Sequence, residues 1–155
     1  MHADAIERTH PSADPVRSAV DCLRVGFQVI GFDWRYVYVN PAAAAHGRRT
    51  VAQLSGRTMM ECYPGIEGTP MFAVLKRCMD DRSADLFDNL FTFPDGQSRW
   101  FEVRVEPVPE GICVYSLDIH ERKQWQLELE ARAASEQPPL GRRLWRSFIS
   151  GQDHA

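Results

Sequence analysis

Between residues 86 and 119 the sequence contains three β-rich segments in succession, and the clean alternation of apolar and polar side chains in the middle one constrains the fold more than any other feature. Such alternation is typical of strands that turn one face to a core and the other to water. Short connections containing proline and glycine separate the three segments, as tight turns require. We therefore predict three consecutive antiparallel strands: LFDNLFTF (86–93), SRWFEVRVEPV (98–108) and GICVYSLDI (111–119).

The first half of the chain adds two further strands and several helices. VGFQVIGFD (25–33) and WRYVYVN (34–40) are β-rich and predict a hairpin that turns around Asp33. Asn40-Pro41 and Thr69-Pro70 each place an N-cap residue before a proline, which predicts two helix starts. The expected fold is therefore α+β, with a five-stranded antiparallel sheet, short helices on one of its faces and a helix at each end.

The predicted elements and the changes in composition divide the chain into five parts. The N-terminus shows no periodic pattern, whereas the C-terminal part contains two prolines and several arginines. The parts are a flexible leader (1–13), an N-terminal cap helix (14–24), a central domain (25–120), an outgoing helix (121–136) and a basic tail (137–155).

Composition excludes several classes of protein. A net charge of −3 over 155 residues gives no reason to expect nucleic acid as a partner. No apolar run reaches the 18–20 or so residues that cross a bilayer, and the N-terminus lacks the pattern of a secretory signal. We therefore expect a cytoplasmic protein. Its four cysteines contain no CxxC pair and are expected to be reduced thiols, without a metal site.

Three stretches carry a likeness to a known family. YVNPAAAAHG, LSGRTMMECYPG and FPDGQSRWFEVRVEPVPEGICVYSLDIHERK follow one another in this order. Together they resemble a PAS domain of the bacterial signal-transduction type, from about Val25 to Lys123. The resemblance implies a five-stranded antiparallel sheet that cups a cavity beneath the central helices. It also implies a sensor, a ligand receptor or a dimerisation module rather than an enzyme.

The resemblance assigns roles to four positions. Asn40 is expected to cap the first central helix. Asp118 and Ile119 correspond to the Asp-Ile-Thr junction that joins the last strand of such domains to the signalling helix. His120 stands where the family usually has threonine. This histidine either pairs with Asp118 or another acid and titrates near neutral pH, or it is an ordinary surface residue.

The resemblance also allows the cofactor classes of the family to be tested. A flavin photoreceptor of this type needs a cysteine where this chain has Met59, and it needs amides where the chain has Phe91 and Phe101. A haem protein needs an axial histidine on the long central helix, which carries Cys78 but no histidine. Haem and flavin are therefore disfavoured, no cofactor is expected, and His46 is assigned no ligating role.

An apolar cavity remains, with two open interpretations. Either polar groups in its wall orient a small, partly apolar ligand, or the phenylalanines fill the core and the domain acts through protein contacts. Asn89 and Ser116 are the expected polar groups. The candidate cavity residues are Phe72, Asn89, Phe91, Phe93, Phe101, Val103, Val105 and Ser116.

Aromatic side chains also indicate an interaction surface. Trp100 and Tyr115 are expected on the outward face of the sheet, where they either meet a partner or lie under the N-terminal helix. Trp125 and Leu129 are spaced four apart in the outgoing helix. We expect a homodimer formed through both flanking helices, and an effector that is either a separate protein or missing from this chain.

The sequence therefore favours a non-catalytic PAS sensor or regulatory module that couples a small ligand or a partner to the C-terminal helix. The alternative is a dimerisation or protein-interaction module without a ligand. A more remote hypothesis is a small cone-shaped enzyme of the NTF2-like type. That fold begins with long helices and needs an acid or base in its interior, whereas the predicted interior is largely apolar.

Overall fold

The computed structural model describes residues 14–136, and the predictions for residues 1–13 and 137–155 lie outside this range. The chain divides after Asp118 into two units, each of which is described by itself. The first unit holds the sheet and its helices, and the second holds a single described helix.

The first unit is built on one five-stranded sheet in the order β2-β1-β5-β4-β3, with every neighbouring pair antiparallel. The α+β fold and the five predicted strands are confirmed. The strands are β1 (Gly26–Gly31), β2 (Tyr36–Val39), β3 (Asp85–Thr92), β4 (Ser98–Val108) and β5 (Gly111–Asp118). The helices are α1 (Pro15–Asp21), α2 (Pro41–His46), α3 (Val51–Leu54), α4 (Met59–Cys62), the 3-10 helix η1 (Ile66–Gly68) and α5 (Pro70–Asp81).

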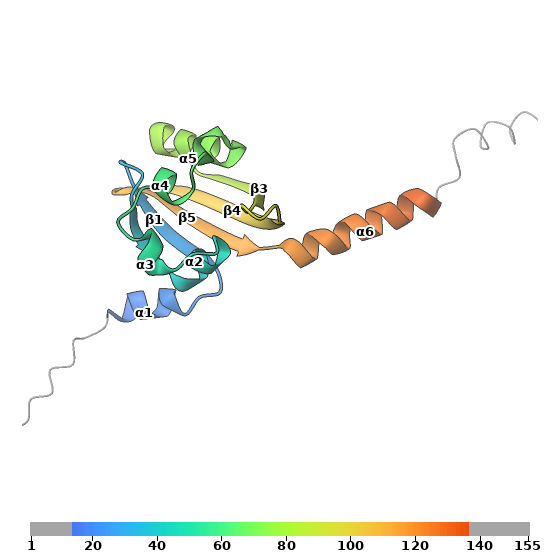
Figure 1. The fold of residues 1–155 in the computed structure, drawn as a ribbon, viewed down its shortest axis with the longest axis horizontal. Helices are drawn as coiled ribbons and strands as arrows, with labels where there is room; N and C mark the ends of the chain where they lie inside the picture. Colours follow the sequence, from blue (N-terminus) through green and yellow to red (C-terminus); the bar gives the residue numbers. More distant parts are fainter. Residues whose placement is uncertain (1–13, 137–155) are drawn as a thin grey trace, which may run out of the picture. The chain divides into compact units, whose positions relative to one another are not determined.

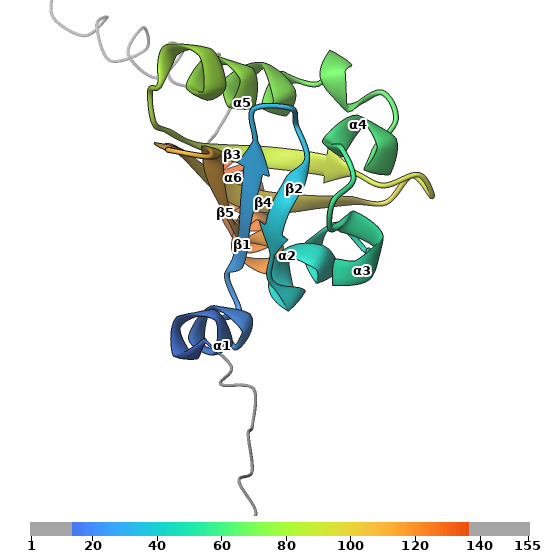
Figure 2. The same ribbon diagram turned by 90° about the vertical axis from the view of Figure 1, so that its left-hand side faces the viewer.

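Alternation along β4 gives the sheet two different faces. Phe101, Val103 and Val105 are buried on the inner face, whereas Glu102 and Arg104 lie on the outer face. Helices α2 and α5 pack against the sheet on its inner face, and α3 and α4 continue this layer (Figures 1 and 2). The predicted pattern of one apolar face is therefore confirmed.

Asn40 joins three elements at the edge of the sheet. Its side chain is completely buried and caps α2, since Oδ1 accepts from the backbone N–H of Ala43 at 2.9 Å. Oδ1 also accepts from the N–H of Phe27 at 2.9 Å, and Nδ2 donates to the carbonyls of Val20 and Val25, both at 3.0 Å. One side chain thus connects the end of α1, the start of β1 and the start of α2.

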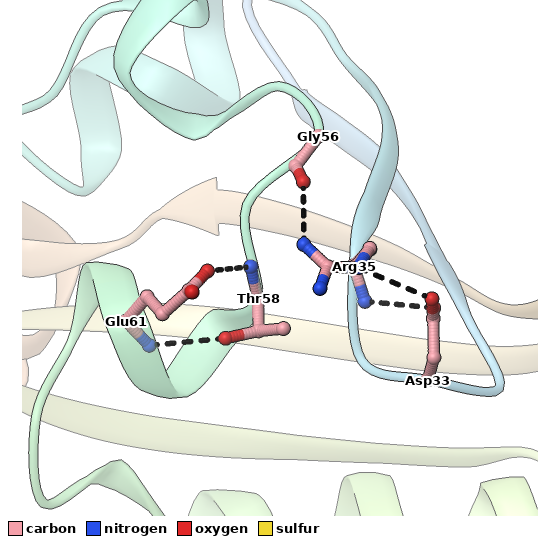
Figure 3. Close-up of polar contacts among 5 residues, drawn as sticks. All are labelled: Asp33, Arg35, Gly56, Thr58 and Glu61. Atoms are coloured by element: carbon pink, nitrogen blue, oxygen red, sulfur yellow. Dashed lines mark hydrogen bonds and ion pairs between the residues drawn. The ribbon is translucent and has the colours of Figure 1, made fainter.

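The β1–β2 hairpin is fastened to the loop before α4 (Figure 3). Arg35 donates from Nη1 to the carbonyl of Gly56 at 2.9 Å and forms an ion pair with Asp33. Thr58 and Glu61 then form a capping box, in which each side chain accepts from the other residue's backbone N–H. These contacts fix the start of α4, whose residues reach the inner face.

The N-caps predicted at Asn40 and Thr69 are confirmed. Asp14 caps α1 and Thr69 caps α5 through side-chain acceptance of a backbone N–H. Helix α2 ends at Gly47, but Gly47 has φ −86°, and Arg48 takes the left-handed conformation with φ 53°. Arg48 then donates to Asp95 and Gln97 in the β3–β4 turn.

The second unit contains α6 (His120–Glu136), none of whose residues is buried. His120 is its first residue, and Ile119 connects it to Asp118. Trp125 and Leu129 are both more than 60% exposed on this helix. Among the described residues, no helix is long and apolar enough to cross a membrane.

Candidate functional site

A cavity of about 80 Å³ lies between the inner face of the sheet and the helices that cover it. Its wall is mainly apolar, with aromatic and aliphatic side chains from β3, β4, β5, α4 and α5. Six residues add polar groups to that wall: Gln28, Tyr36, His46, Tyr63, Asn89 and Ser116. This mixture is typical of a pocket for a small, partly apolar molecule.

Five of the eight residues that the sequence placed in the cavity line it: Asn89, Phe91, Phe101, Val103 and Ser116. Phe72, Phe93 and Val105 lie elsewhere in the core. Phe72 stacks on Trp34 with ring centroids 4.6 Å apart, and Phe93 lies beneath the guanidinium of Arg48. Val105 is 0% exposed and belongs to the packed core. Alternation identifies the face of a strand, but it does not say which positions along that face border a void.

His46 lines the cavity, although sequence reasoning assigned it no role there. It ends α2, and its Nδ1 lies 2.8 Å from Oγ of Ser116 on β5. Its ring also lies against Phe101, with centroids 5.0 Å apart. Gly26 permits this approach, because a Cβ there would clash with Ser116 and come within 2.9 Å of Nδ1 of His46. A glycine inside a β-rich segment was the available signal, since it marks a close approach.

The cavity disfavours charge. Among the described residues, its wall contains no aspartate, glutamate, lysine or arginine. Burial lowers the pKa of His46, while Asp118 raises it and Arg99 lowers it further. Burial also raises the pKa of Tyr63 to about 12, and it raises the pKa of Tyr36 beyond its ordinary range. The polar groups of the wall are therefore neutral near pH 7.

Asp118 ends β5 two residues after Ser116. Its carboxylate accepts from Nε of Arg99 at 2.5 Å, and in the β4–β5 register Asp118 pairs with Phe101. Ser116 pairs with Val103 in the same register. Arg99 is a second residue that sequence reasoning missed, because nothing in its neighbourhood in the sequence names a partner.

The outer face of the sheet carries exposed apolar side chains. Leu90 lies opposite Trp100 in the β3–β4 register, and Tyr115 lies opposite Arg104 in the β4–β5 register. Leu86 is 60% exposed and Leu117 is 39% exposed. Trp100 is half-buried and Tyr115 is likewise half-buried.

Helix α1 lies at the other edge of the sheet. Its side chains contact β2, where the hydroxyl of Tyr38 donates to Asp21 and Arg17 lies over the ring of Tyr38. Strand β2 and strand β4 are separated by two strands in the sheet order. These contacts join α1 to the β2 edge of the sheet, whereas Trp100 lies on β4.

Among the described residues, no group of three or more histidine, cysteine, aspartate or glutamate side chains could hold a metal ion. Burial raises the pKa of the thiols of Cys62 and Cys78. A raised pKa keeps a thiol protonated, and a protonated thiol is neither a good nucleophile nor a good metal ligand.

Comparison with known proteins identifies the fold of this arrangement. Residues 20–124 match the family model described as the PAS fold. No curated protein matches the chain. Among solved structures, the chain is similar to an RNA-binding light-oxygen-voltage receptor, with a TM-score of 0.61 and 21% identity. That alignment covers 88% of this chain and 41% of the receptor, so the chain spans less than half of the receptor's length.

Two shorter proteins are similar over nearly their whole length. The PAS domain of nitrogen regulation protein NR(II) from Vibrio parahaemolyticus has a TM-score of 0.53 and 14% identity, over 69% of this chain and 100% of that domain. The PAS domain of a LuxR-family transcriptional regulator from Burkholderia thailandensis, in complex with ethanol, has a TM-score of 0.52 and 17% identity, over 66% and 96%. Identities this low show a shared fold.

Proposed function

The chain belongs to the PAS fold family, and from this premise we propose that it is a non-catalytic sensory module. In this proposal a small molecule occupies the cavity, and its presence is transmitted through the end of β5 to α6. PAS domains are generally non-catalytic sensor modules, which supports the first part of the proposal. The ethanol held by the B. thailandensis domain shows that a related fold accepts a small molecule.

The position of Ser116 carries the second part. Ser116 lines the cavity, and Asp118 ends the same strand two residues later, immediately before Ile119 and α6. Because alternate residues of a strand share a face, Ser116 and Asp118 both point toward the helices. A ligand that displaces Ser116 therefore acts on the strand that holds the Arg99–Asp118 ion pair.

We expect the module to work without haem, flavin or metal. Cys62 in α4 and Cys78 in α5 have thiol pKa values that burial raises. A protonated thiol is a poor nucleophile and a poor metal ligand, which supports this expectation. We also expect a cytoplasmic location and an effector that receives the signal from α6.

The coupling can be tested by NMR titration of the ¹⁵N-labelled full chain with butyramide. Shifts at His46 and Ser116 report binding, and shifts at residues 119–124 report transmission. We expect both in the wild type. In Asp118→Ala we expect binding to remain and the shifts beyond residue 118 to be lost, whereas Glu110→Ala, at the other end of β5, should behave like the wild type. Binding without any change in residues 119–124 of the wild type would refute the coupling.

A second function is favoured by the outer face of the sheet. Leu86, Leu90 and Leu117 are exposed there beside the half-buried Trp100, and exposed apolar patches often mark protein contacts. We expect this face to contribute to a homodimer. Sedimentation analysis of Leu90→Glu should then show more monomer than the wild type, while Val37→Glu, an exposed position on β2, should leave the distribution unchanged.

A further inference from the structure

We propose that the His46–Ser116 pair recognises small uncharged molecules that carry an amide or a hydroxyl group, and that the cavity rejects charged molecules of the same size. This inference rests on the proposed function, because it names the ligand class for the same cavity. Four observations support it: the volume of the cavity, the chemistry of its wall, the geometry of the pair and the position of the nearest charges.

The volume limits the size of the ligand. A cavity of about 80 Å³ is much smaller than the roughly 300–1,000 Å³ of pockets that hold drug-sized ligands, so only a compact molecule fits it. Two surface grooves, beside η1 and β3, share Ile66 and Phe91 with the cavity wall. A compact molecule with a short carbon chain and one polar group fits this space.

The wall limits the charge of the ligand. An ion that enters a cavity without a countercharge loses its hydration and gains no compensating partner. The wall offers amide, hydroxyl, phenol and imidazole groups and, among the described residues, no fully charged side chain. Arg99 and Asp118 are the charges that act on His46, but they are paired with each other and neither lines the cavity.

The pair offers matched hydrogen-bonding capacity to an uncharged ligand. A serine hydroxyl has one donor and two acceptor positions, and the 2.8 Å contact with Nδ1 of His46 uses one of them. A second polar group lies on β3, where Nδ2 of Asn89 donates to the sulfur of Met71 at 3.5 Å. Sulfur is a weak acceptor, so this amide can exchange it for a better one. A ligand with both a donor and an acceptor satisfies these groups.

Glycine at position 26 supports a built site rather than incidental packing. A Cβ there would clash with Oγ of Ser116 and would lie 2.9 Å from both Nδ1 of His46 and Cα of Ala43. The close crossing of α2, β1 and β5 therefore depends on the missing side chain, and this crossing brings His46 and Ser116 into contact.

The ligand class is tested with three probes of the same chain length: butyramide, butyrate and butylammonium. Each is titrated into the full ¹⁵N-labelled chain at pH 7.5, and the shifts of His46 and Ser116 are followed. We expect saturable shifts with butyramide and at least about tenfold weaker binding of both ions, because neither finds a countercharge. Equal or tighter binding of butyrate or butylammonium would overturn the inference while leaving ligand sensing intact. If none of the three binds, both the inference and the sensing proposal fail.

The pair itself is tested with variants. Ser116→Ala and His46→Leu should each weaken butyramide about three- to tenfold, the effect of losing one net hydrogen bond. His46→Gln, which keeps a donor and an acceptor, should restore most of the affinity, and Thr92→Ala, outside the cavity wall, should not change it. If butyramide binds Ser116→Ala and His46→Leu as it binds the wild type, the pair is not the recognition site. Ser116→Ala alone decides the matter if the histidine variant does not fold.

Discussion

The inner face of the sheet is tightly packed at one end and hollow at the other, although β4 and β5 supply both ends. At the packed end, Val105 and Ile112 are completely buried. At the hollow end, Ser116 lies at the cavity and is in contact with His46. Ile112 and Ser116 lie four residues apart on the same face of β5. The direction in which the strand turns its side chains therefore does not determine which end is hollow.

The difference lies in the helices that cover each end. Helix α5 presents a stripe of apolar side chains, of which Cys78 and Met79 are buried away from the cavity, whereas Leu75 borders it. Helix α2 presents the alanines at 43 and 44, which are short, and then His46. Short side chains allow close approach of the helix without filling the volume beyond them. The small side chain of Ala43 and the imidazole of His46 therefore form the part of the cavity wall that α2 supplies.

The largest effect on the free energy of unfolding is expected from Ile112→Ala, which we compare with Ser116→Ala. We expect Ile112→Ala to lower the free energy of unfolding by about 2–5 kcal/mol, because it opens a cavity in a packed region. Ser116→Ala removes one hydrogen bond beside space that already exists, so it should cost about 1 kcal/mol or less. Urea denaturation of both variants measures the difference. Similar losses at the two positions would mean that the hollow end is packed as tightly as the other.

The packed end was predictable from sequence, whereas the hollow end was predictable only in part: Asn89 and Ser116 were placed at the cavity, but His46 was not. Period-two alternation in 98–108 and helical spacing in 70–81 place apolar residues against one another whatever the details of the fold. The same rules placed Phe93 and Val105 in the cavity, because they describe faces and not volumes. The contact between His46 and Ser116 joins residues 70 positions apart, and it depends on how closely α2 approaches the sheet. No pattern of neighbouring residues in the sequence predicts how close α2 comes to β5.

A smaller effect on the free energy of unfolding is expected when a side chain is added at Gly26, on β1 beside His46 and Ser116. In Gly26→Ala the new Cβ would clash with Ser116 and press on Cα of Ala43, so α2 must move away from the sheet. We expect a loss of about 1–3 kcal/mol in the free energy of unfolding, together with loss of butyramide binding. Gly68→Ala is the matched control, because a Cβ there meets nothing within 4 Å. It should change stability by about 0.5 kcal/mol or less. Tight butyramide binding by Gly26→Ala would show that the close crossing is not required.

The smallest effect is a pH dependence that belongs to the hollow end. Burial lowers the pKa of His46 below its ordinary value of 6.5, with Asp118 opposing the shift and Arg99 adding to it. The unfolded chain therefore binds a proton at a higher pH than the folded chain, so stability is fully present above about pH 6.5 and falls as the pH drops below it. The pKa values of Glu61 and Asp95 are also lowered, but these two groups affect stability in a separate pH range. Their contributions to the free energy of unfolding are lost only as the pH falls below their ordinary pKa values of 4.5 and 3.8.

The histidine contribution is isolated by comparing the wild type with His46→Gln. Urea midpoints between pH 5 and 7.5 should decrease with falling pH in the wild type and decrease less in the variant. Butyramide binding by the wild type should weaken only at lower pH, where the folded protein itself takes up the proton, because a protonated imidazole loses its acceptor and brings a charge to an uncharged wall. An identical pH dependence in the two proteins would place the titrating group elsewhere. Since His46 is the only titratable group of the cavity wall, among the described residues, whose ordinary pKa lies near neutrality, this measurement connects the chemistry of the hollow end directly to its function.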